Sequence, residues 1–301
     1  MRLLLFAVTS FGVATGAFAQ ELTHANGDIS FSVLDDGDET SEVTNVEASI
    51  GYQAGSLDLF GDVIFTDLDL DGDETDISTG GLGAGYSFAG RFRTDVSYTQ
   101  FENTVIGFDD AIDVAEVGLG FNDGLFLVRG AYAFLEEDSG ADGVYGLMLG
   151  LQFSEDTDAS VSRHRIDPED EGDAENLTIA SLNHNGDILD LEIDMIISDD
   201  VFSVGLNGDY AISPRFGVVG SLAQVSIDDD DVLDRVGAGG FVQIADGLRV
   251  DAEIFRIGTD GDDVDGFSFG LRYDMGAKSV DRETQIDRLN TATNRSFGLD
   301  F

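Results

Sequence analysis

The amino-acid sequence predicts an all-β fold: a transmembrane antiparallel up-and-down β-barrel of about 16 strands, with 14 and 18 as alternatives. Apolar and polar residues alternate with a period of two through most of the chain. Most alternating segments hold nine to thirteen residues, which suits membrane-spanning strands (about 9–11 residues) better than soluble ones (about 5–6). Tight turns alternate with acidic loops between these segments, as in a sheet that faces two environments.

The N-terminus carries the three parts of an export signal. Arg2 supplies the positive charge, residues 3–13 are apolar, and Ala17-Phe18-Ala19 fits a cleavage site. We therefore expect residues 1–19 to be a signal peptide and 20–275 to form the barrel. Residues 276–301 would be a C-terminal segment, either a last strand or a periplasmic or lumenal tail.

The expected strands follow from the alternation of apolar and polar residues along the chain. In 188–197 leucine, isoleucine and methionine take every second position, and acids stand between them at 190, 192 and 194; apolar residues also take alternate positions in 91–99, 125–134 and 265–275. Alternation is weakest in 158–166 and 176–184. The expected strands are 27–34, 43–53, 57–67, 77–88, 91–102, 112–122, 125–135, 143–153, 158–166, 176–184, 187–198, 201–211, 215–227, 232–243, 248–258 and 264–275.

The connections fall into two classes. The tight turns are at 54–56, 89–91, 122–124, 185–187, 213–215 and 245–247, and the acidic loops are at 35–42, 67–76, 136–143, 167–175, 228–231 and 260–265. The acidic class holds no lysine or arginine and accounts for most of the formal net charge of −45. This charge excludes nucleic acid as a partner, because phosphates repel such a surface. The absence of cysteine excludes disulfides and thiolate metal sites.

Charged residues within the strands predict a wet interior. An arginine that faces lipid at the midplane of a barrel costs about 2–4 kcal/mol, so the strand arginines should point inward with the carboxylates that share their parity. We expect this lumen to be near charge balance and the acidic loops to attract cations. The candidate pore-lining residues are Arg91, Arg93, Asp95, Arg129, Arg163, Arg165, Asp190, Glu192, Asp194, Arg235, Arg249 and Arg272.

One acidic loop contains a weak candidate metal site. Asp67, Asp69, Asp71 and Asp73 have the spacing of the first half of a calcium loop, but position twelve is Ser78 instead of glutamate. A solvated acidic loop is the better interpretation, with Ca²⁺ or Mg²⁺ bound loosely if at all. We expect no other cofactor and no enzyme, because His24, His164 and His184 stand in no catalytic motif.

The end of the chain carries a family resemblance. Residues 268–275 show the polar–x–Gly–x–x–aromatic–x–hydrophobic spacing, and the chain ends in Phe301. With the export signal and amphipathic strands, the chain resembles Gram-negative outer-membrane porins of the general diffusion type. The resemblance implies an outer-membrane location, insertion by the barrel-assembly machinery, contact with membrane lipid and lipopolysaccharide, and a possible homotrimer. It also implies an inward-folding loop near 103–111, although a simple strand extension there is more consistent with the residues.

Three functions are left open by the sequence. The resemblance favours passive diffusion of small hydrophilic solutes and ions, biased to cations by the acidic loops. A non-conducting structural or divalent-cation-binding barrel is the alternative. A secreted soluble β protein fits less well, because phenylalanine-rich faces exposed to water would aggregate.

Overall fold

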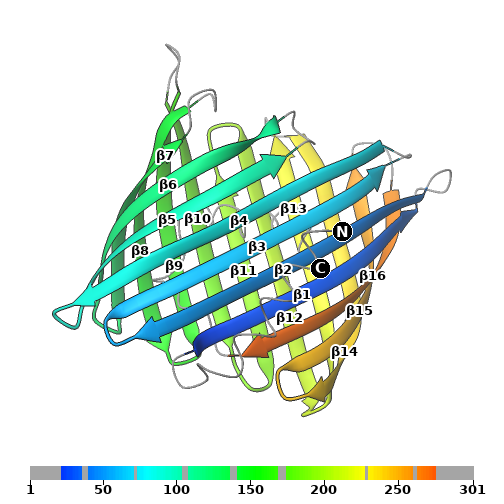
Figure 1. The fold of residues 1–301 in the computed structure, drawn as a ribbon. Helices are drawn as coiled ribbons and strands as arrows, with labels where there is room; N and C mark the ends of the chain where they lie inside the picture. The colour runs from blue at the N-terminus through cyan, green and yellow to red at the C-terminus, as the bar shows by residue number, and fades with distance from the viewer. Residues whose placement is uncertain are drawn as a thin grey trace.

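The structure, a computed structural model, is a closed antiparallel barrel of sixteen strands (Figure 1). It describes residues 22–35, 40–70, 73–103, 108–135, 141–168, 174–227, 230–259 and 263–275. The strands are β1 Leu22–Asp35, β2 Thr40–Ala54, β3 Leu57–Leu70, β4 Asp73–Phe88, β5 Phe92–Asn103, β6 Phe108–Asn122, β7 Phe126–Leu135, β8 Ala141–Ser154, β9 Thr157–Pro168, β10 Glu175–Asn185, β11 Leu189–Ile197, β12 Val201–Ser213, β13 Phe216–Ile227, β14 Asp230–Ala245, β15 Leu248–Thr259 and β16 Asp263–Met275.

Each strand pairs with its neighbours in sequence, and the ring is closed by β1 against β16, where Ile29 lies opposite Leu271. The predicted fold and strand number are confirmed, including β9 and β10, whose alternation is poor. Since β1 and β16 each have two partners, the barrel is complete without residues 276–301. That segment and the predicted signal peptide 1–19 lie outside the described residues.

The acidic connections are shorter than the sequence suggests. Strands β3 and β4 continue through most of 67–76, so that Asp67 pairs with Asp76 and Leu70 with Asp73. Between β5 and β6, Asn103 pairs with Phe108. Residues 103 and 108 therefore extend the sheet, in agreement with the strand extension that the residues favoured over the inward loop implied by the resemblance; 104–107 lie outside the described residues. Because paired strands satisfy each other's backbone N–H and C=O groups, a hairpin can continue beyond the part of the barrel wall that carries apolar outward side chains.

The turns at the opposite end fix the register of each hairpin. At the β6–β7 turn, the Asn122 side chain accepts a hydrogen bond from the Gly124 amide at 2.8 Å, and Gly124 has φ 90°. The Asp123 carboxylate accepts hydrogen bonds from the amides of Phe126 at 2.8 Å and Leu125 at 3.1 Å. These two bonds, led by Phe126, lower the pKa of Asp123.

The barrel wall has two chemically different faces. On one face large apolar side chains are exposed, among them Leu82 at 66%, Leu119 at 58% and Ile254 at 67%. On the other face lie buried serines, carboxylates and arginines such as Ser203, Asp58 and Arg93. Because side chains alternate along every strand, this division follows directly from the period-two pattern of the sequence. None of the described residues forms a helix that could cross a membrane.

Candidate functional site

The polar face is the inner wall of the barrel. Arg249 on β15 forms an ion pair with Asp209 on β12, three strands away along the sheet. Arg129 on β7 similarly reaches Asp95 on β5. Side chains can meet over intervening strands only on the concave side of a closed sheet. The apolar side chains of opposite parity therefore point outward.

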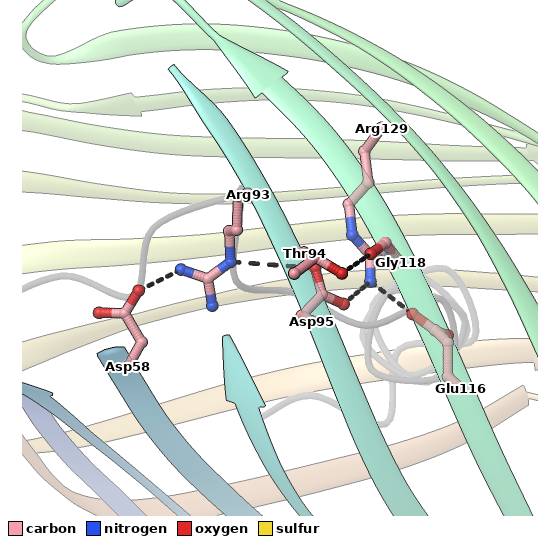
Figure 2. Close-up of polar contacts among 7 residues, drawn as sticks. All are labelled: Asp58, Arg93, Thr94, Asp95, Glu116, Gly118 and Arg129. Carbon is pink, nitrogen blue, oxygen red and sulfur yellow. Dashed lines mark hydrogen bonds and ion pairs between the residues drawn. The ribbon is translucent and has the colours of Figure 1, made fainter. Parts of the chain in front are cut away.

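A dense ion-pair network covers the inner wall from β3 to β7 (Figure 2). Arg93 donates to Asp58 and lies 3.9 Å from Asp95. Arg129 donates to Asp95 at 2.6 Å and to Glu116 at 2.5 Å. Arg129 is only 5% exposed, so two carboxylates offset the cost of removing this cation from water.

Glycines let these guanidinium groups lie flat against the wall. A Cβ atom on Gly118 would stand 2.5 Å from Asp95 Oδ2 and 2.7 Å from Arg129 Nη2. A Cβ on Gly85 would collide with the Arg93 guanidinium. These strands thus use glycine for the close approach of a side chain. An arginine that lies along the wall contributes its charge without projecting into the lumen.

A second network lies on β12 to β16 and β1. Arg235 donates to Ser221 at 2.7 Å and to Glu253 at 3.2 Å, with its guanidinium carbon 4.5 Å from the centre of the Phe255 ring. Arg249 pairs with Asp209 and lies 3.5 Å from Asp251. Arg272 reaches Asp28 across the closing seam at 3.2 Å. Five predicted pore-lining arginines therefore lie on the inner face: Arg93, Arg129, Arg235, Arg249 and Arg272.

Between the two networks, the inner face of β8 to β12 presents carboxylates but no arginine among the described residues. Asp190, Glu192 and Asp194 alternate along β11, and Asp209 lies opposite Asp190 on β12. Asp190, Glu192 and Asp209 line a recess that Arg249 and Arg272 also line. The inner face of β8 to β12 is therefore acidic, and it adjoins the arginine-containing network on β12 to β16 and β1.

Part of the inner wall becomes apolar toward the end of the barrel that carries the acidic connections. Val114, Ala133 and Val144 form one cluster there, and Ile179 and Ile196 form another. The sequence did not predict such a zone, because inward positions were expected to be polar. The described inner face near this mouth is therefore aliphatic on β6 to β8 and on β10 and β11, whereas Ser32, Asn45 and Thr66 make it polar on β1 to β3.

Three predicted pore-lining residues do not lie on the inner face. On β9, Arg163 lies opposite Leu147 and Arg165 opposite Tyr145, both of which are exposed on the outer face, while His164 between them is buried on the inner face. Arg163 and Arg165 therefore point outward, and the prediction that they line the pore is wrong. Arg91 is an exposed residue of the β4–β5 turn, so it is not on either strand face.

The expected charge balance is also wrong. With those three arginines removed, carboxylates outnumber arginines on the described inner wall. Sequence reasoning missed several of these acids because their partners lie on other strands, although the parity of each strand could have found them. The inward carboxylates are Asp28, Glu47, Asp58, Asp62, Asp95, Glu116, Asp158, Asp190, Glu192, Asp194, Asp209, Asp251, Glu253 and Asp274.

The candidate calcium ligands lie in or beside a hairpin. Asp67 and Asp69 belong to β3 and Asp73 to β4, while Asp71 lies outside the described residues. The strand pairing of 67–70 with 73–76 differs from the loop that a calcium site of this spacing requires. Within the described part of the chain, no three histidine, aspartate or glutamate side chains are grouped to hold a metal ion. Loose cation binding stays a prediction.

Comparison with known proteins finds similarity in structure only. No protein-family model matches the sequence, and no curated protein is similar to it in sequence. A mutant of Rhodopseudomonas blastica porin matches with a TM-score of 0.52 at 11% identity, over 84% of this chain and 99% of the porin. Salmonella typhi OmpF, in a complex with daunomycin, matches with a TM-score of 0.60 at 10% identity, over 86% and 99%. The barrel therefore has the fold of bacterial porins.

Proposed function

We propose that this chain is an outer-membrane channel through which small hydrophilic solutes and ions diffuse passively, with cations favoured. The observation that carries the proposal is the two-faced wall of the closed barrel. Apolar side chains cover its outside, and ion pairs and carboxylates cover its inside. A closed barrel leaves no sheet edge unpaired, which is the condition for a sheet in hydrocarbon.

The width of the barrel supports a channel instead of a filled core. Small barrels of about eight strands are filled by side chains, whereas barrels of about 16 strands leave an aqueous channel. In this chain the glycines beneath Arg93 and Arg129 hold bulky groups against the wall. The porin fold of the structural neighbours supports a channel without enzymatic activity, and it supports an outer-membrane location.

The cation preference rests on the inner wall more than on the acidic connections. Rings and rows of carboxylates raise the local concentration of cations in a channel. The arginines on the inner face are held by Asp28, Asp58, Asp95, Glu116, Asp209 and Glu253, and the row Asp190–Glu192–Asp194 adds further negative charge. Insertion by the barrel-assembly machinery and a homotrimer stay expectations from the resemblance.

Planar-bilayer recording of the mature chain tests the proposal. We expect stable ohmic current steps, and a reversal potential under a salt gradient that shows cation preference. Replacing the β11 row (D190N, E192Q and D194N together) should shift that potential toward the value for equal permeability. The outward carboxylate Asp234 on β14 provides a matched control, and D234N should leave the potential unchanged.

The absence of current from correctly inserted barrels would contradict the channel. Insertion is checked independently by heat-modifiable migration on gels and by β-type circular dichroism. Stabilisation by Ca²⁺ without current would instead favour a structural or divalent-cation-binding barrel.

A further inference from the structure

The inner face of β10 to β13 is buried near the acidic connections, although it faces the lumen. Ile179 on β10 and Val225 on β13 are 0% exposed, and Ile196 on β11 is 5% exposed. The apolar cluster around Ile179 consists of Ile196 and Leu177, which belong to the same wall. Neighbours within a sheet shield the flanks of a side chain but leave open the side that points away from the sheet. Burial to this degree therefore calls for a chain segment that lies across the wall from the lumen.

A row of carboxylates precedes this apolar patch on the same wall. Along β11 from the turn end, Asp190, Glu192 and Asp194 come before Ile196 on the inner face. Asp194 accepts a hydrogen bond from Ser181 and is 3% exposed. The cost of removing a carboxylate from water is offset most strongly by a cation, and the described part of β8 to β12 has no inward arginine or lysine. A segment that covers this wall should therefore bring cations to the row and apolar side chains to the patch.

The sequence of residues 276–301 complements this wall. This segment holds four basic and four acidic residues, whereas residues 20–275 hold ten basic and 56 acidic ones. A negative lumen therefore repels it less than any acidic connection. The order of its residues also matches the wall, because Lys278 and Arg282 come first and Ile286 and Leu289 follow.

The chain leaves β16 close to the beginning of the carboxylate row. Arg272, three residues before the end of β16 at Met275, lines the same recess as Asp190. At about 3.3 Å per residue, Arg282 reaches up to about 23 Å and Ile286 up to about 36 Å from Met275. The apolar patch lies roughly 16 Å above Asp190, from the rise and tilt of β11. The other segments of 20–275 outside the described residues hold five residues or fewer, so 276–301 is the long segment within reach.

We propose that residues 276–301 fold back into the lumen and dock on the inner face of β10 to β13, as a tail that narrows the channel on its acidic side. Lys278 and Arg282 pair with the carboxylate row, where burial strengthens ion pairs. Ile286 and Leu289 cover the apolar patch and remove it from water. The ion-pair network on β3 to β7 lies on the other side of the lumen and stays beside the open path. The docking itself does not depend on whether the barrel conducts.

Cross-linking of paired cysteines in the full-length mature chain tests the docking, since the native chain has no cysteine. I286C is combined either with I196C on the inner face or with I197C, the adjacent outward position, where the native side chain is 43% exposed. With a short bismaleimide we expect I286C/I196C to give roughly tenfold more intramolecular product than I286C/I197C, because a docked segment has a high effective concentration at its own site. S203C, opposite Ile196 on β12, serves as a second inner anchor if I196C prevents folding.

The charges of the tail are tested in the same cysteine background. K278Q/R282Q should lower the yield of the I286C/I196C product about fivefold, because two ion pairs with the carboxylate row are lost. R256Q removes an arginine from the outer face of β15 and should leave the yield unchanged.

Three outcomes would overturn the docking. These are equal yields with the inward and outward anchors, no product with either inward anchor, and product only at the mass of two chains, which would show that the tail reaches another copy. Bilayer current recorded from the same samples separates the two proposals. The I286C/I196C product without current sinks only the channel, and current without that product sinks only the docked tail.

Discussion

Arg129 and Arg163 stand two strands apart in the same barrel and have opposite surroundings. Arg129 on β7 faces inward, is 5% exposed and is held by two carboxylates. Arg163 on β9 faces outward, is exposed, and lies beside Leu147. The comparison teaches that charge alone does not decide which way a strand residue points. Parity relative to the neighbouring strands decides it, and the cost of an outward cation depends on depth.

The largest expected difference between the two positions is in stability. R129L leaves Asp95 and Glu116 buried beside an apolar side chain, and should lower the free energy of unfolding by about 3–5 kcal/mol. R163L, a substitution of the same size, should change it by less than about 1 kcal/mol. Denaturant unfolding followed by circular dichroism measures both, since the chain has no tryptophan. Equal effects would contradict the assigned faces.

A smaller effect should follow from filling the space beneath Arg129. In G118A the new methyl group would meet Asp95 and Arg129, and should destabilise the barrel by about 1–3 kcal/mol and reduce the single-channel current as the guanidinium moves toward the lumen. Gly80 on β4 points outward with open space around it, so G80A serves as control and should leave the current unchanged. A normal current in G118A would show that the guanidinium does not border the conducting path.

Ion selectivity should distinguish inward from outward arginines with a modest shift. R249Q removes the cation beside Asp209 and Asp251, and should increase cation preference because those carboxylates lose their partner. R163Q removes the same charge from the outer face and should leave the reversal potential unchanged. If R249Q and R163Q shift the reversal potential by the same amount, this potential depends on the total charge of the protein and not on the charges of the inner wall.

The smallest effect is expected at the turn that sets the register of β6 and β7, and with it the inward direction of Arg129. The hydrogen bonds from Phe126 and Leu125 lower the pKa of Asp123, so its contribution to stability is complete above the ordinary aspartate pKa of 3.8 and is lost as pH falls through the lower folded-state value. D123A should therefore lower the thermal midpoint slightly at pH 7 and have less effect near pH 2. A difference from wild type that stays constant with pH would contradict this role.

Much of the fold could be predicted because alternation is strong. In β11 and β16, apolar residues occupy every outward position of the central part, so strand identity and parity follow from the sequence together. The pattern failed on β9, where Ser160, Ser162 and His164 alternate with Val161 and two arginines. Both faces are largely polar there, and the assumption that arginine avoids lipid selected the wrong one. Arg91 was misplaced because strand β5 begins one residue later.

The partners within the site could not be predicted in the same way. Asp58 and Arg93 are separated by a whole strand, as are Asp95 and Arg129, and only the pairing and register of three neighbouring strands bring them together. The acidic segments were assigned as long loops because composition does not reveal that paired strands continue through them.

Cysteine scanning of β11 tests the central claim, the two-faced wall, most directly. The native chain has no cysteine, so single substitutions at Asp190, Leu191, Glu192 and Ile193 can be probed in a bilayer with a charged, water-soluble thiol reagent. The account predicts that reagent changes the current at 190 and 192 and leaves it unchanged at 191 and 193. A response without this alternation, or one at 191 and 193 only, would contradict it.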